Sequence, residues 1–94
     1  MKWLEIIELR TSENNSEAAI KELARLINEI NQKNQNKGVT LYLKAYLKTD
    51  ISLHIRHHED HIPQGGSDLG LNIAASLKVY GLVNHQLWQE VFIN

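Results

Sequence analysis

Apolar and polar residues alternate over two stretches in the middle of the chain, and this alternation predicts two β-strands. Apolar residues occupy every odd position from 39 to 47, and again from 51 to 55. A period of two places all of these side chains on one face of a sheet. Opposing the apolar residues across a hairpin favours a three-residue loop, Lys48–Asp50, which would place Leu47 opposite Ile51 and Leu43 opposite Ile55.

The first segment, WLEIIELR at 3–10, is apolar on both faces of a predicted strand. Trp3 and Ile7 share one face with Glu5, whereas Leu4 and Ile6 lie on the other. A strand with two apolar faces is typical of a central position in a sheet. We therefore expect this strand to have a neighbour on each side.

Two helices are predicted by apolar residues at helical spacing. The first follows the capping-rich TSENNS at 11–16, with Asn15 or Ser16 as N-cap, and runs for about four turns before the polar NQKNQNKG at 31–38. The second is capped by Ser67 and runs to about Tyr80, where Gly81 ends it. Residues 85–92 fit either a strand or a short helix, and we favour the strand because it completes a known topology.

The resulting order, strand–helix–strand–strand–helix–strand, predicts an α+β fold: a ferredoxin-like βαββαβ antiparallel sheet with two helices on one face. Its 94 residues suffice for a single domain spanning positions 1–94. The other face of the sheet would be open and only half polar, which in so small a domain predicts a homodimer. The polar residues expected on that face are Tyr42, Lys44, Tyr46, His54, Arg56 and His58.

Composition argues against several classes of partner. Eleven acidic residues against ten basic residues leave a net charge of −1, so neither nucleic acid nor an acidic membrane is an expected partner. A helix-turn-helix over residues 73–91 would lack lysine and arginine on its second helix, so it could not bind the phosphates of DNA. The chain has no cysteine, no signal-like segment and no apolar run of about 20 residues. These features favour a cytoplasmic protein.

In layout and length the chain resembles the dimeric α/β-barrel group of ferredoxin-like proteins. That group includes antibiotic-biosynthesis monooxygenases, haem-degrading enzymes and stress-response proteins. Its haem-degrading members use an asparagine on the first strand together with a tryptophan and a histidine. The first strand here contains no asparagine, so the resemblance does not extend to that activity, although His85 and Trp88 are present.

The segment HIRHHEDHIPQGGSD at 54–68 holds four of the five histidines, which raises the possibility of a metal site. On a strand His54 and His58 are about 13 Å apart, too far to share one metal, and Arg56 lies between them. A loop at His57–His61 that gathers two histidines with Asp60 is the remaining metal hypothesis. We assign no metal ligand from the sequence.

Acid–base chemistry requires only one well-placed histidine, because the ordinary histidine pKa is near neutrality. His54 and His58 are the candidate catalytic residues, on the expected open face. Tyr42 and Tyr46 would form aromatic walls, and Lys44 and Arg56 would anchor an anionic group. Glu5 would join this cavity if its face of the first strand were the open one, or else pair with a cation.

A third hypothesis concerns PQGGSDLG at 63–70. Gly65, Gly66 and Ser67 precede a predicted helix, where free backbone N–H groups and the helix dipole favour an anion. The spacing matches neither a phosphate-binding loop nor a dinucleotide fingerprint.

Together these features predict a small-molecule-binding homodimer, with or without cofactor-free turnover of an aromatic or anionic organic substrate in a cavity on the sheet face. The alternatives are a non-catalytic dimerisation or regulatory module and a histidine-based metal-binding protein.

Overall fold

The computed structural model describes residues 2–33 and 38–93. Its elements are β1 (Trp3–Thr11), α1 (Glu13–Lys33), β2 (Gly38–Leu43), β3 (Asp50–His57), α2 (Asp68–Leu77) and β4 (Gly81–Gln89). The four strands form one antiparallel sheet in the order β2-β3-β1-β4. The predicted ferredoxin-like fold is therefore confirmed, as is the central position of β1. The choice of a strand rather than a helix for the segment that begins at residue 85 is also confirmed, as part of β4.

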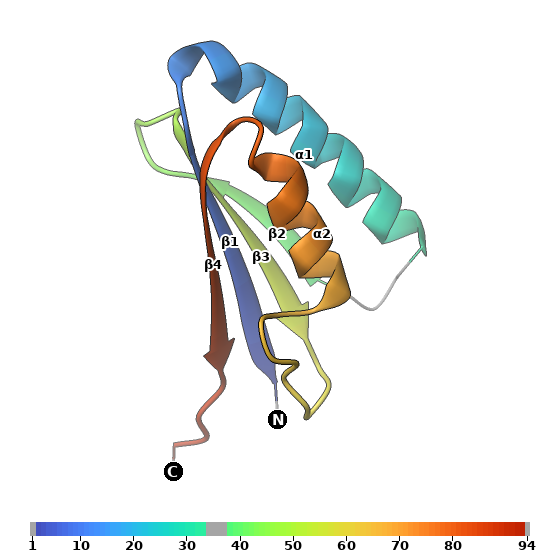
Figure 1. Ribbon diagram of the computed structural model, residues 1–94. Helices are drawn as coiled ribbons and strands as arrows, with labels where there is room; N and C mark the ends of the chain where they lie inside the picture. Colours follow the sequence, from blue (N-terminus) through green and yellow to red (C-terminus); the bar gives the residue numbers. More distant parts are fainter. Residues whose placement is uncertain (1, 34–37, 94) are drawn as a thin grey trace.

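The two helices lie on the same face of the sheet, and the chain ends lie near each other (Figure 1). The core between helices and sheet takes alternate residues of every strand, including Ile7 and Leu9 of β1 and Leu53 of β3, together with Leu23 of α1 and Ile73 of α2. No element among the described residues covers the opposite face, which we call the open face. Directly paired residues share a face, so the register places the following residues on it: Leu4, Ile6, Glu8, Arg10, Thr40, Tyr42, Asp50, Ser52, His54, Arg56, Leu82, Asn84, Gln86 and Trp88.

The predicted hairpin faces are right, but the predicted three-residue loop is wrong. Leu43 pairs with Ile51, not with Ile55, and β2 ends there. Residues 44–49 form the connection, held by hydrogen bonds from Lys44 N–H to the Asp50 carbonyl and from Leu47 N–H to the Lys44 carbonyl. The left-handed residue is Tyr46, with φ of 68°, rather than Asp50. The register error is four residues, an even number, so each side chain keeps its predicted face.

The first helix is longer than predicted and starts earlier. Its 21 residues make about six turns. The capping residue is Ser12 rather than Asn15 or Ser16, because Ser12 Oγ accepts a hydrogen bond from Asn15 N–H at 3.2 Å. Within the predicted polar connection at 31–38, residues 34–37 lie outside the described residues, and Gly38 already belongs to β2.

The second helix begins where the sequence predicts. Ser67 is its N-cap, with Oγ accepting from Gly70 N–H at 2.9 Å. The helix ends at Leu77, three residues before the predicted end at Tyr80, and Gly81 already belongs to β4. No helix in the described parts of the chain is long and apolar enough to span a bilayer.

Candidate functional site

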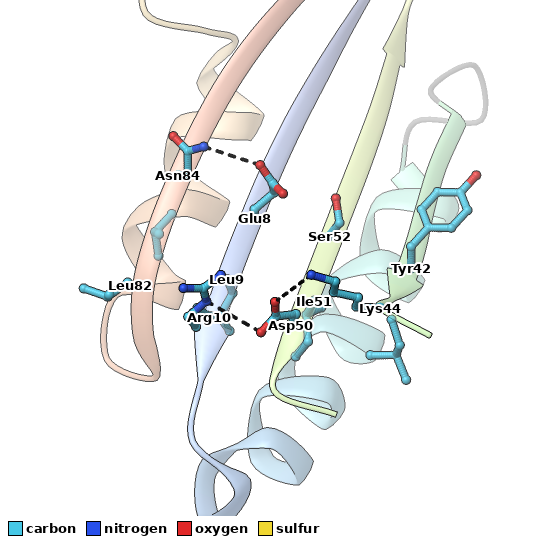
Figure 2. A pocket seen from close by; sticks show the side chains of 12 residues that line it. Glu8, Leu9, Arg10, Tyr42, Lys44, Asp50, Ile51, Ser52, Leu82 and Asn84 are labelled. Atoms are coloured by element: carbon cyan, nitrogen blue, oxygen red, sulfur yellow. Dashed lines mark hydrogen bonds and ion pairs between the residues drawn. The ribbon is translucent and has the colours of Figure 1, made fainter. Parts of the chain in front are cut away.

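Two groups of polar residues stand out, one on each face of the sheet. The first surrounds a hollow of about 520 Å³ at the end of the open face where β1 finishes and β3 begins. Figure 2 shows the side chains around it, which come from all four strands and from the β2–β3 connection. Its polar lining residues are Glu8, Arg10, Tyr42, Lys44, Asp50, Ser52 and Asn84, and Leu82 contributes an apolar wall.

Charges in the hollow are arranged around Asp50. The Arg10 guanidinium lies 3.7 Å from one carboxylate oxygen of Asp50, and the Lys44 ammonium lies 3.9 Å from the other (Figure 2). Arg10 and Lys44 are both largely exposed, so these two ion pairs are weak and open to exchange. Glu8 accepts a long hydrogen bond of 3.4 Å from the Asn84 side-chain amide. One end of the hollow therefore presents two cations that share a single carboxylate.

His54 lies two residues beyond Ser52 along β3, beside the hollow rather than in its wall. Its Nε2 is 3.0 Å from Ser52 Oγ, and its ring contacts that of Tyr42 with 4.6 Å between centroids. Burial, followed by the nearby Arg56 guanidinium, lowers the pKa of His54, against an opposing effect of Glu8. A lowered pKa favours the neutral form of the ring, which is the form that a general base requires.

The structure brings together only part of the predicted site. Tyr42 and Lys44 line the hollow and His54 adjoins it. Tyr46 is in the β2–β3 connection and fully exposed. Arg56 lies at the other end of the face, six residues or about 20 Å from Asp50, and His58 follows the end of β3. One small ligand bound to a single protomer cannot contact all six predicted side chains.

The second polar group is buried on the helix side of the sheet, and it centres on the fully buried Glu5. Its carboxylate accepts four hydrogen bonds. They come from His57 Nε2 at 2.8 Å, His85 Nε2 at 2.6 Å, Ser67 Oγ at 2.6 Å and Ser67 N–H at 3.1 Å. A carboxylate has about four lone-pair positions, so this acceptor is saturated. Burial alone would raise the pKa of Glu5, but the hydrogen bonds from Ser67, His57 and His85 outweigh it and lower that pKa.

Two glycines leave the space that this carboxylate occupies. A Cβ at Gly66 would lie 2.5 Å from Glu5 Oε2, and a Cβ at Gly70 would overlap the same oxygen. Gly66 also has φ of 116°, a conformation that favours glycine. The anion at the N-terminus of α2 is thus the chain's own Glu5, beside the predicted anion site at Gly65, Gly66 and Ser67. Binding of an external anion there stays a prediction, and it would require Glu5 to move.

His57 is held on a second side by aromatic stacking. Its ring lies parallel to that of Trp3, with 3.8 Å between centroids and 11° between planes. The buried Trp3 Nε1 has no hydrogen-bond partner among the described residues. His57 Nδ1 is 3.7 Å from Glu59 Oε2.

The metal hypothesis gains no support from this cluster. His57 and His85 both direct Nε2 at the Glu5 carboxylate as hydrogen-bond donors. The described residues contain no group of three or more histidine, aspartate or glutamate side chains arranged to hold a metal.

Comparison with known proteins supports the fold. No family model matches the chain, and no curated protein matches it in sequence. The solved structure of Rv0793 from Mycobacterium tuberculosis matches with a TM-score of 0.71 at 16% identity, over 99% of this chain and 98% of that chain. A crystal structure of an antibiotic biosynthesis monooxygenase matches with a TM-score of 0.63 at 6% identity, over 95% of this chain and 98% of that one. The chain therefore has the ferredoxin-like fold and layout of the dimeric α/β-barrel group, and the predicted resemblance is confirmed at the level of fold.

Proposed function

We propose that the protein is a homodimer that buries its open sheet face and binds a small aromatic or anionic organic molecule in the hollow on that face. The observation that carries the proposal is the hollow itself. Its volume of about 520 Å³ falls within the range of small-molecule sites. It combines apolar walls with a few convergent polar groups, on a face that no described element covers.

The apolar content of the open face supports the dimer. Leu82 is 75% exposed, Trp88 57% and Tyr42 45%, while Leu4 and Ile6 are only partly covered. Exposed apolar surface of this extent, interrupted by polar groups, is typical of interaction sites. A two-fold axis through the face would bury all five side chains in both protomers and turn each open hollow into an enclosed cavity.

Ligand chemistry follows from the lining residues. Tyr42 and Leu82 offer apolar contact area at the rim, whereas Arg10 and Lys44 can each exchange a weak ion pair with Asp50 for one with a ligand carboxylate. Dimerisation would exclude water from the hollow and strengthen the ion pairs between these two cations and the ligand carboxylate. An aromatic carboxylate offers both an apolar ring for Tyr42 and Leu82 and an anionic group for Arg10 and Lys44. This class of compound is therefore the first choice for testing.

The dimer is tested by placing a charge on the open face. We expect Leu82→Lys to weaken dimerisation at least 10-fold, measured by sedimentation equilibrium, because the interface would have to bury an unpaired ammonium group. Val79→Lys is the matched control, because Val79 is equally exposed but lies in the turn after α2. A wild-type chain that stays monomeric at high concentration would refute the dimer.

Ligand binding is tested with a panel of aromatic carboxylates in heteronuclear NMR titrations. We expect amide shifts around Ser52 and Asn84, and a roughly 10-fold weaker affinity in Arg10→Gln, since one charged hydrogen bond is worth about 1.5 kcal/mol. Arg25→Gln, which removes an arginine from the outer face of α1, should bind as the wild type does. A dimer that binds no member of the panel would instead favour the non-catalytic dimerisation module.

A further inference from the structure

Ser52, in the wall of the hollow, and His54, beside the hollow, form a hydrogen-bonded pair. Ser52 lines the hollow, and its Oγ lies 3.0 Å from His54 Nε2. A hydroxyl and an imidazole at this distance are in the arrangement by which a neighbouring base activates a serine as a nucleophile. The pair comes from alternate residues of β3, so the regular strand fixes its geometry.

The surroundings keep His54 able to accept a proton. Burial and the Arg56 guanidinium of the same strand disfavour the imidazolium form, while Glu8 of β1 favours it less strongly. In the neutral ring with its hydrogen on Nδ1, Nε2 can accept the Ser52 hydroxyl proton. Tyr42 of β2 packs against the ring at an interplanar angle of 49° and restricts its rotation.

We propose that Ser52 and His54 form a nucleophile–base pair that cleaves small carboxylic esters bound in the hollow, a proposal that rests on the binding function proposed above. Ser52 Oγ forms a bond to the ester carbonyl carbon while its proton passes to His54 Nε2. The bond from that carbon to the leaving oxygen breaks, and the leaving group takes the proton from His54. Water then attacks the carbonyl carbon of the acyl-serine while His54 Nε2 accepts its proton. The bond from that carbon to Ser52 Oγ breaks and Oγ takes the proton from His54, which releases the acid and restores Ser52.

Two cations in the hollow match the charge that develops in this reaction, and they act against two carboxylates, those of Asp50 and of Glu8, which pairs with Ser52 across the sheet. The tetrahedral intermediate carries a negative oxygen, which nearby cations stabilise. Arg10 and Lys44 surround Asp50, which is two residues or about 7 Å from Ser52 along the same face. The apolar side chains of Tyr42 and Leu82 suit a short apolar or aromatic acyl group.

The test is hydrolysis of 4-nitrophenyl acetate by the intact chain, with release of 4-nitrophenolate followed by absorbance. We expect kcat/KM to fall about 100-fold or more in both Ser52→Ala and His54→Ala, which remove the nucleophile and the base. Ser76→Ala and His61→Ala, both at exposed positions away from the hollow, should match the wild type. The wild-type rate should fall as the pH drops through the depressed pKa of His54, because protonation removes its acceptor.

Covalent labelling provides a measurement that does not depend on how the variants fold. A fluorophosphonate should modify Ser52 stoichiometrically in the wild-type protein, identified by mass spectrometry of the peptide that contains it. Labelling at other serines only, or hydrolysis that survives Ser52→Ala, would overturn the proposal.

Binding of an uncleaved analogue separates this proposal from the proposed function. 4-Nitroacetanilide is the amide counterpart of the ester, and we expect it to shift the amide signals of Ser52 and Asn84. Shifts without Ser52-dependent hydrolysis or labelling would refute the nucleophile–base pair and leave ligand binding intact. The absence of hydrolysis and labelling, with no shifts from this amide or from the panel of aromatic carboxylates, would refute both.

Discussion

Replacement of Glu5 by leucine is expected to lower the free energy of unfolding by about 3–5 kcal/mol, a large part of the total stability of a small domain. Leucine would remove the acceptor that the buried His57 shares with the partly buried His85 and Ser67. These donors come from β3, β4 and the start of α2, so one side chain of β1 connects three other parts of the fold. Urea denaturation monitored by circular dichroism measures the loss.

Glu5→Gln should be less damaging, at about 1–2 kcal/mol. The amide oxygen can still accept from His85 and from Ser67 N–H. The amide nitrogen can donate to His57 and to Ser67 Oγ, provided that His57 changes tautomer and the hydroxyl rotates. Glu8→Leu on the exposed face of the same strand is the control, and it should change stability by only about 0.5 kcal/mol or less. If Glu5→Gln costs as much as Glu5→Leu, the negative charge rather than hydrogen-bond saturation holds this cluster together.

The dependence of stability on pH provides a second measurement of the same carboxylate. The pKa of Glu5 is lower in the folded protein than its ordinary value of 4.5. A group with a depressed folded pKa contributes stability above its unfolded pKa and loses that contribution as the pH falls through the folded pKa. The wild type should therefore lose stability on acidification below pH 4.5, and Glu5→Gln should lose less over the same interval. Parallel curves for the two proteins would contradict this assignment.

Periodicity in the sequence was sufficient to predict the fold. Alternation in β2 and β3 set their faces, and those assignments survived the wrong hairpin loop because the register error was an even number of residues. The loop itself was not predictable from alternation, since the pattern continues through Ala45 and Leu47, which are exposed in the connection. Lys44 N–H still donates to the Asp50 carbonyl at the start of β3. Beyond it, Leu47 N–H donates to the Lys44 carbonyl and Tyr46 adopts a left-handed conformation, so the chain turns before the alternation ends.

The buried cluster was only partly foreseeable. Glu5, His57 and His85 each occupy a position where the alternation of their strand calls for an apolar residue. His57 continues the series Ile51, Leu53, Ile55, and Glu5 lies between Trp3 and Ile7. A polar residue at a core-facing position predicts a buried partner. Its identity depended on register, because the partners of Glu5 are 52, 62 and 80 residues away.

For the open-face site, the sequence predicted the face on which side chains lie but not which of them lie close together. Strand parity correctly placed His54 and Arg56 on one face, but proximity along the strand could not be inferred from parity. Arg56 and Lys44 share a charge and were expected to bind one anion together. Lys44 instead lies beside Asp50, and six residues of β3, about 20 Å, separate Asp50 from Arg56. Arg10 and Asp50 were missed because they lie at strand ends, where sequence alone does not show which ends meet. Asn84 was missed because its place depends on the register of β4 with β1.

Gly70→Ala is expected to destabilise the protein by about 1–3 kcal/mol, the usual cost of overpacking, although alanine is the better helix former. In α2 the new methyl group would overlap the Glu5 carboxylate and force it away from Ser67 and the histidines. Asn72→Ala, at an exposed position of the same helix, isolates the effect of helix propensity and should be neutral or slightly stabilising.

The decisive comparison is the double variant Glu5→Ala with Gly70→Ala, measured by urea denaturation. Removing the Glu5 side chain leaves space for the methyl group, so in that background Gly70→Ala should no longer destabilise and should recover the helix propensity of alanine, up to about 1 kcal/mol. The two substitutions must then be strongly non-additive, because they act on the same small volume. Additive effects would mean that Gly70 is required for a reason other than the space occupied by Glu5, and the carboxylate would not be what excludes a side chain from the first turn of α2.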